Sequence, residues 1–176
     1  MTFSRSPSVL LPLLFVLAGT LTGCSSSHTT KSTEVPSFPS YTLHGEKAHL
    51  EPRVPAQLRG AVRKLTSPFD GYSQEASAEI ILNGKHLYEG KGICVDCHGW
   101  AGKGDGPASQ MVRPGPRDFT NCQFHKQRTD GELFWVIKNG SPDTDMASMI
   151  PYPINEEEAW KIILYVRTFC PSWRKE

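Results

Sequence analysis

Five consecutive residues, Cys94-Val95-Asp96-Cys97-His98, carry the side chains of this sequence best suited to metal and redox chemistry. Two thiols separated by two residues, with a histidine directly after the second, form the attachment signal for a c-type haem. The thiols bond the vinyl groups of the porphyrin, and the imidazole of the same helical turn can ligate the iron from one face. We therefore predict that Cys94 and Cys97 hold one covalent haem c and that His98 is an axial ligand.

Two other kinds of site also use a Cys-x-x-Cys pair. A thioredoxin-like redox pair requires a βαβ context, and no such pattern surrounds Cys94. A structural zinc site requires a second pair of cysteine or histidine ligands at a similar spacing, and no such pair follows. The sequence therefore favours haem attachment as the function of this cysteine pair.

The N-terminus has the layout of an export signal. A positive charge at Arg5 precedes an almost wholly apolar run from Val9 to Leu21, as in the n-region and h-region of a secretory signal. This run is shorter than the roughly 20 residues that span a bilayer as a helix. Leu21-Thr22-Gly23-Cys24 resembles the lipobox of bacterial lipoproteins, which implies a signal peptide of residues 1–23 and a lipid on the Cys24 thiol.

An exported, lipid-anchored protein faces the periplasm. Ser25, rather than aspartate, follows the lipidated cysteine, which by the same resemblance favours the outer membrane in Gram-negative bacteria. Disulfides form in this compartment, and the assignments above leave Cys122 and Cys170 of the five cysteines. We predict that these two pair; two separate buried thiols are the alternative. The net charge is only +1, so nucleic-acid binding, which normally needs a basic excess, is not expected.

Residues 24–72 are predicted to form a lipid-anchored flexible tether. The stretch from Ser25 to Gly60 is rich in serine and threonine, contains several prolines and shows no apolar periodicity, which is typical of an extended segment. The folded domain is then expected to comprise residues 73–176.

Three helices are predicted in this domain. Apolar spacing indicates a first helix from Ser73 or Gln74 to Glu89, in which Gly84 suits a close crossing with another helix. Thr129 and Glu132 form a capping box for a second helix over residues 130–138. Asn155 caps a third helix that continues to Cys170. No strand pattern is present, so we expect an all-α fold.

The motifs from Gln74 to Phe169 resemble, in order, the class I cytochrome c domain in its single-haem bacterial form. The resemblance implies an all-α fold of about three to five helices around one covalent haem, in which Tyr165 meets Gly84 and Tyr88. The segments that carry the resemblance are Gly84–Tyr88, Cys94–Gly99, Gly102–Pro107, Pro116–Thr120, Thr129–Trp135, Gly140–Met146 and Trp160–Tyr165.

The resemblance also places the second axial ligand in the loop before the last helix. The family pattern Gly-x-x-x-Thr-x-Met-Pro aligns with Gly140, Thr144 and Met146, although Ala147 stands in place of the proline. Met146 is the first choice and Met149 the second. A thioether ligand raises the reduction potential relative to a second imidazole and closes the sixth coordination position. The remaining candidates are Met111 and His125.

Two further expectations concern the surroundings of the haem. The other ring N–H of His98 is expected to donate to a backbone carbonyl, which orients the ligand; the predicted carbonyls are those of Pro114 and Pro116. Arg117 and Trp100 are the side chains expected to approach the haem propionates.

Together these features predict an electron carrier rather than an enzyme. Two protein ligands leave no position for a substrate, so the iron would only cycle between Fe(II) and Fe(III). The chain would be a shuttle or the cytochrome subunit of a respiratory complex, with a membrane respiratory complex or a periplasmic oxidoreductase as its redox partner. The alternative is a gas-binding or sensing haem protein with a displaceable sixth ligand.

Overall fold

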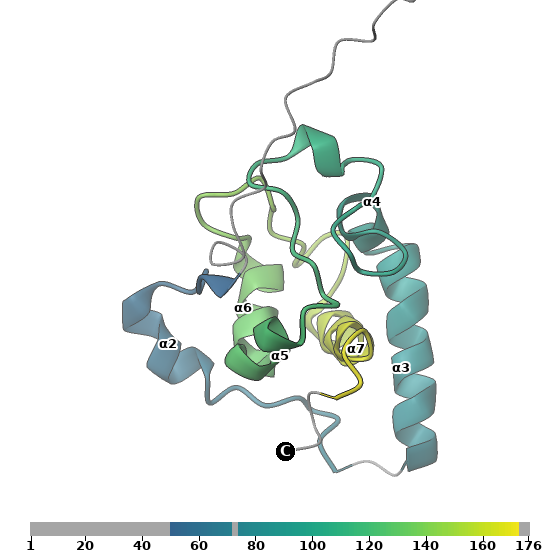
Figure 1. Cartoon of the computed structure of the whole chain (residues 1–176). Coiled ribbons are helices and arrows are strands. Elements are labelled where there is room, and N and C mark those ends of the chain that lie inside the picture. Colours follow the sequence, from purple (N-terminus) through teal and green to yellow (C-terminus); the bar gives the residue numbers. More distant parts are fainter. Residues whose placement is uncertain (1–49, 72–73, 173–176) are drawn as a thin grey trace, which may run out of the picture. The chain divides into compact units, whose positions relative to one another are not determined.

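The computed structural model describes residues 50–71 and 74–172 (Figure 1). These residues form α-helices and one short 3-10 turn, with no strand among them, so the predicted all-α fold is confirmed. The predicted signal peptide, Cys24 and the part of the predicted tether up to residue 49 lie outside the described residues. The elements are α2 (Ala56–Val62), α3 (Gln74–Glu89), α4 (Cys94–His98), η1 (Ser109–Met111), α5 (Cys122–Gln127), α6 (Asp130–Asn139) and α7 (Glu156–Arg167).

The described residues contain six α-helices, more than the three to five that we predicted. The sequence indicated neither α2 nor α5, because both are too short to show an apolar period and depend on packing for their stability. None of the helices that the structure describes is long and apolar enough to cross a membrane.

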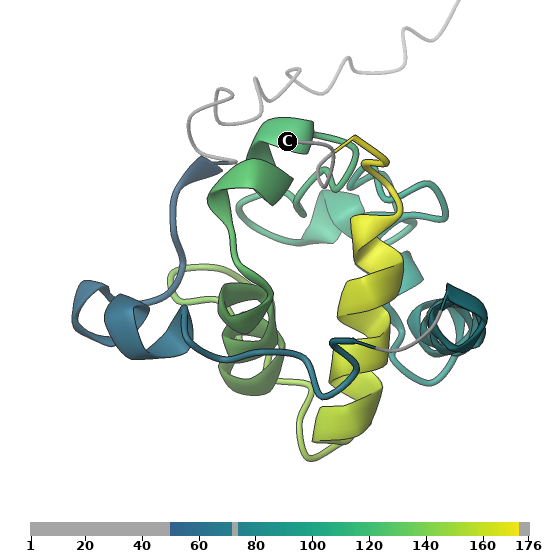
Figure 2. The ribbon, with the colours of Figure 1, turned by 90° about the horizontal axis from the view of Figure 1, so that it is seen from below.

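Helices α3 and α7 cross and form the main helix pair of the domain (Figures 1 and 2). A Cβ atom at Gly84 would overlap the backbone carbonyl of Lys161. The rings of Tyr88 and Tyr165 meet edge to face, with centroids 5.4 Å apart. The predicted close crossing at Gly84 is therefore confirmed, together with its aromatic contact.

Both predicted capping residues occupy their expected places. The Thr129 side chain accepts from the Glu132 N–H at the start of α6, and the Glu132 carboxylate accepts from the Thr129 N–H. Asn155 forms the same reciprocal pair with Glu158 at the start of α7. Helix α7 ends at Arg167, three residues before the predicted end, because the following residues form tighter turns.

A disulfide joins Cys122, at the start of α5, to Cys170, just beyond α7. Their Cα atoms are 5.4 Å apart, and 48 positions separate them in the sequence. The bond therefore ties the C-terminal end of the described chain to the segment between α4 and α6.

Residues 50–67, which we call the leading segment, pack on α6. The side chains of Val54 and Val62 are buried, and a Cβ atom at Gly131 would overlap the Val62 carbonyl. These residues lie within the stretch predicted as a tether, where the sequence shows no helical period. The contact requires a residue without a side chain at Gly131. The sequence of α2 alone therefore could not predict that this helix packs here.

Replacing Gly84 with alanine is expected to lower the free energy of unfolding by about 1–3 kcal/mol, since the added methyl group forces α3 and α7 apart. Helix propensity alone predicts the opposite sign, about 1 kcal/mol in favour of alanine. Gly60→Ala in α2 is the matched control, because a Cβ atom there meets nothing within 4 Å. Urea unfolding followed by circular dichroism measures both; equal or greater stability of G84A would contradict the close crossing.

Replacing Cys122 and Cys170 together with serine is expected to destabilise the protein by about 2–4 kcal/mol, because the unfolded chain loses the constraint of a long closed loop. Chemical unfolding with and without a thiol reductant gives the comparison. Reductant should lower the midpoint of the wild type and leave that of the double variant unchanged. An unchanged wild-type midpoint would show that the bond does not stabilise the fold.

Candidate cofactor site

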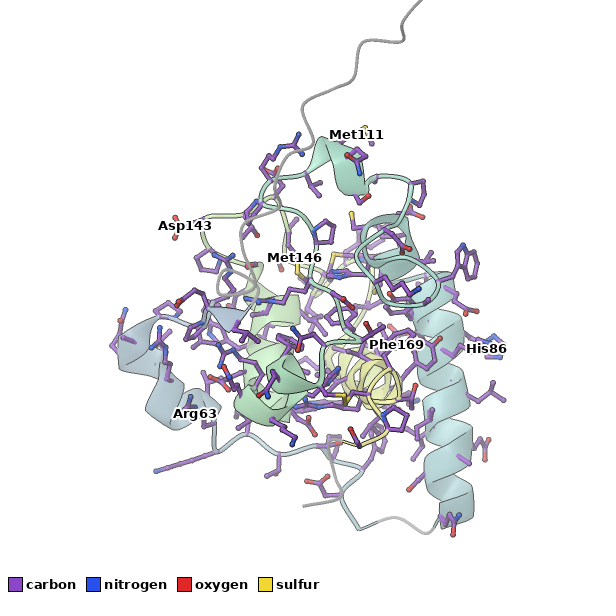
Figure 3. All side chains as sticks on the ribbon, viewed as in Figure 1. Arg63, His86, Met111, Asp143, Met146 and Phe169 are labelled. Atoms are coloured by element: carbon purple, nitrogen blue, oxygen red, sulfur yellow. A yellow bond between two sulfur atoms is a disulfide. The ribbon has the colours of Figure 1, made fainter. Side chains whose placement is uncertain are left out.

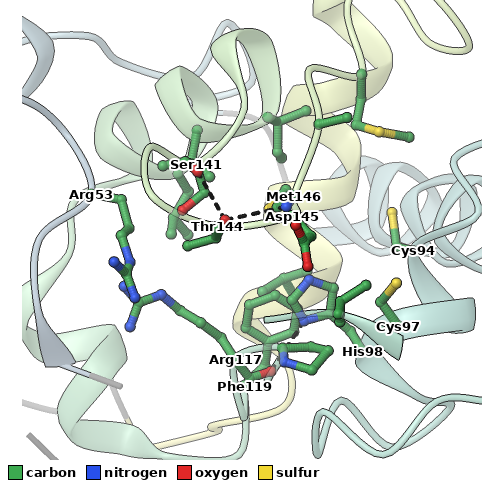
Figure 4. Close-up of a pocket in the computed structure, with 18 of the residues that line it drawn as sticks. Arg53, Cys94, Cys97, His98, Arg117, Phe119, Ser141, Thr144, Asp145 and Met146 are labelled. Atoms are coloured by element: carbon green, nitrogen blue, oxygen red, sulfur yellow. Dashed lines mark hydrogen bonds between the residues drawn. The ribbon is translucent and has the colours of Figure 1, made fainter. Parts of the chain in front are cut away.

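A cavity of about 430 Å³ lies between α4, the loop 112–119, α6 and the loop before α7. This volume is within the roughly 300–1,000 Å³ typical of ligand pockets. Most of its lining is apolar, and Cys94, Cys97, His98 and Met146 all contribute to it (Figure 4). The structure therefore brings both predicted thiols, the predicted imidazole and the preferred thioether to a single cavity.

Helix α4 is one turn long and is held by its neighbours rather than by its own hydrogen bonds. The N–H groups of Gly104, Gly106 and Ala108 donate to the carbonyls of His98, Cys97 and Asp96, at 2.8, 3.1 and 2.8 Å. The glycine-rich loop, residues 99–108, thus provides hydrogen bonds to the carbonyls that a helix C-terminus leaves without partners. A Cβ atom at Gly106 would overlap these same turns of backbone, which explains a glycine at this position.

The two thiols of the cavity are free and partly buried. Burial raises the pKa of Cys94 to about 12. Burial and the nearby Asp96 carboxylate also raise the pKa of Cys97. Both thiols are therefore protonated at neutral pH. In the described part of the chain, no group of three or more histidine, cysteine or acidic side chains is placed to hold a metal ion.

His98 is 8% exposed, and its ring stacks on Phe119 with centroids 4.3 Å apart. Burial lowers the pKa of His98 to about 4, so the imidazole is neutral. Its Nδ1 lies 3.1 Å from the Arg117 carbonyl. A neutral ring that donates from Nδ1 has its lone pair on Nε2, which is the atom left for an iron ion.

The carbonyl beside His98 belongs to Arg117, so the prediction of Pro114 or Pro116 was wrong. The Pro116 carbonyl faces Gly104 instead, where a Cβ atom would approach it to 2.6 Å. The Phe119 N–H donates to the Gly102 carbonyl at 2.6 Å. These two backbone contacts determine which carbonyl of the loop 112–119 lies beside His98. The local sequence gives no sign of them.

Four side chains were candidates for the second axial ligand. Two of them line the cavity and two do not. Met146 and Met149 both line the cavity, but Met149 also packs against the hydrophobic core. Met111 lies on η1 at the surface, 78% exposed (Figure 3). His125 has both ring nitrogens engaged, Nε2 with the Phe119 carbonyl and Nδ1 with an arginine.

A buried hydrogen-bond donor without a partner faces this region. Arg117 lines the cavity, and its Nη1 is buried with no acceptor. Such a donor is costly unless an anion or carbonyl reaches it. Haem c carries two carboxylates, so its polar edge fits this arginine as its apolar face fits the rest of the cavity. Trp100, by contrast, is 66% exposed and does not line the cavity.

Known sequences and structures resemble this chain to different degrees. A search of curated protein sequences gives no significant match. Among solved structures, a chain of the reducing HAO-like protein complex of Kuenenia stuttgartiensis is 31% identical, with a TM-score of 0.47. The alignment covers 52% of this chain and 44% of that one, so this chain spans less than half of that relative's length. A TM-score this low carries no structural argument.

The profile of the cytochrome c family matches residues 81–169, just over half of the 176-residue chain. This range includes both thiols, the buried imidazole, and both methionines of the cavity. Membership implies a covalently attached haem c, which the paired thiols and the apolar cavity suit. The chain belongs to the cytochrome c family.

Proposed function

We propose that this cytochrome transfers single electrons through one haem c, bonded to Cys94 and Cys97 and ligated by His98 and Met146. The observation that carries the proposal is the shared cavity, which has a buried neutral imidazole and a thioether in its lining beside two free thiols. When bound, the haem supplies an iron ion that accepts and releases one electron. His98 and Met146 would hold the iron and would leave it no coordination position for a substrate.

The imidazole side of the site is held rigidly. The Nδ1–H group of His98 donates to the Arg117 carbonyl, and the Phe119 ring stacks on the imidazole. The hydrogen bond fixes which nitrogen faces the metal and increases the basicity of the ligand.

The loop that carries Met146 is closed by its own hydrogen bonds. The Ser141 N–H donates to the Met146 carbonyl at 2.9 Å. The Thr144 hydroxyl donates to the Ser141 carbonyl at 2.8 Å and accepts from the Met146 N–H (Figure 4). Thr144 thus links both ends of the loop and supports the Met146 side chain at the cavity.

Met149 has a different set of partners. Its N–H donates to the Ile137 carbonyl, its carbonyl accepts from Ile154, and its side chain packs against the buried core. These contacts favour a structural role and support Met146 as the axial ligand.

Replacing Met146 with alanine is expected to abolish the long-wavelength absorption band that a thioether ligand gives to ferric haem c. Met149→Ala should retain the band and instead lower the free energy of unfolding by about 1–2 kcal/mol, because this partly buried side chain packs against the core. Absorption spectra of the oxidised variants make the comparison. Loss of the band in the Met149 variant alone would reverse the assignment.

We also propose that the protein is a lipoprotein facing the periplasm. In this proposal residues 1–23 are the signal peptide, Cys24 carries the lipid, and residues 25–49 connect the lipid to the leading segment. The leading segment packs on α6 and so belongs to the cytochrome domain together with residues 73–176. Support comes from the apolar run and the lipobox-like Leu21–Cys24. A membrane respiratory complex or a periplasmic oxidoreductase is the proposed redox partner, met through a weak, short-lived interface.

Replacing Cys24 with serine is expected to move the protein from the membrane fraction to the soluble periplasmic fraction and to abolish labelling by a fatty-acid analogue. The haem spectrum should not change, because residue 24 is far in sequence from the cavity residues. Fractionation of cells expressing each form gives the result. Membrane retention of the variant with an unchanged distribution would refute lipid anchoring at this cysteine.

A further inference from the structure

The leading segment, residues 50–67, forms part of the wall of the haem cavity. Arg53 and Val54 both line the cavity, and Val54 is buried. The family match begins only at residue 81. The cavity therefore includes two side chains from outside the region that this chain shares with its family.

The leading segment is fastened to the rest of the domain at several points. The Arg117 side chain donates to the Glu51 carbonyl at 2.6 Å, and the Arg128 side chain donates to the Leu50 carbonyl. Farther along, Arg63 pairs with the buried Glu132 at 3.3 Å. The segment thus holds Arg53 in place from both sides.

Arg53 faces a second arginine across this part of the cavity. The Arg53 and Arg117 side chains point toward one another (Figure 4). Among the described residues, no carboxylate or carbonyl accepts a hydrogen bond from the Arg53 side chain. Glu51 is the acid that acts on Arg117, but its backbone carbonyl, not its carboxylate, makes the hydrogen bond.

Two positive charges face one another in this part of the cavity. The side chains of Arg53, Arg117 and Arg128 all line the same cavity. Like charges in an apolar cavity are unfavourable unless an anion lies between them. The unpartnered Nη1 of Arg117 lies where such an anion would be bound.

We propose that Arg53 and Arg117 together bind a carboxylate of the haem, so that the leading segment helps to set the reduction potential. The inference rests on the proposed function. The arginines lie across the cavity from the two cysteines (Figure 4), and haem c carries its carboxylates on the edge opposite the vinyl groups. Arginine forms paired hydrogen bonds with carboxylates. Its charge opposes the extra positive charge of Fe(III), so it favours the reduced state and raises the potential.

The test is the reduction potential of the holoprotein, measured by spectroelectrochemical titration for Arg53→Gln, Arg53→Lys and Lys64→Gln. Lys64 is an exposed residue of the same segment that does not line the cavity, so its loss is a matched change of charge. Arg53→Gln should lower the potential, equivalent to a roughly tenfold smaller equilibrium constant for reduction. Arg53→Lys should keep most of the wild-type value, and Lys64→Gln should leave it unchanged.

A potential for Arg53→Gln that equals that of Lys64→Gln would overturn the inference. An Arg53→Lys potential as low as that of Arg53→Gln would do the same, because it would assign the effect to packing rather than charge. The proposed function is judged separately, on the wild type. Absence of covalent haem or of reversible one-electron reduction there would count against the function and not against the role of Arg53.

Discussion

Helices α3 and α7 meet backbone to backbone at Gly84, because a side chain there would overlap the Lys161 carbonyl. The chain leaves α3 and turns directly into α4, which carries His98, while the loop that carries Met146 leads directly into α7. The crossing therefore acts as the common support of both sides of the cavity. We therefore expect a change in the α3–α7 distance to alter the separation of His98 and Met146, although neither residue belongs to these two helices.

The same crossing is connected to the attachment motif by a buried hydrogen bond. The Tyr88 hydroxyl donates to the Gly99 carbonyl at 2.8 Å, and burial raises the pKa of Tyr88 well above its usual range, so the hydroxyl keeps its proton. The glycine-rich loop then satisfies the remaining carbonyls of α4. A single turn of helix, unstable by itself, is thereby held with two thiols and an imidazole in the lining of one cavity.

Features encoded by adjacent residues were predictable, and features encoded by contacts between distant segments were not. The Cys94–His98 spacing, the Thr129 and Asn155 caps and the α3 period all act within a few residues. The Arg117 carbonyl beside His98 depends on how two loops pack on each other. The place of Arg53 in the cavity depends on α2 docking at Gly131. No local sequence pattern indicates the position of the Arg117 carbonyl or of the Arg53 side chain. An arginine between prolines is equally typical of an exposed tether.

We propose that His98 and Met146 fill both axial positions of the iron, so that the site passes electrons and binds no substrate. Carbon monoxide binds ferrous haem only where a coordination position is open or its ligand is readily displaced. Mixing carbon monoxide with the reduced protein at neutral pH, while recording the absorption spectrum, tests the claim directly. We predict no rapid spectral change. Rapid formation of a carbon monoxide complex would show that a coordination position is open or easily vacated, and would favour a gas-binding haem protein.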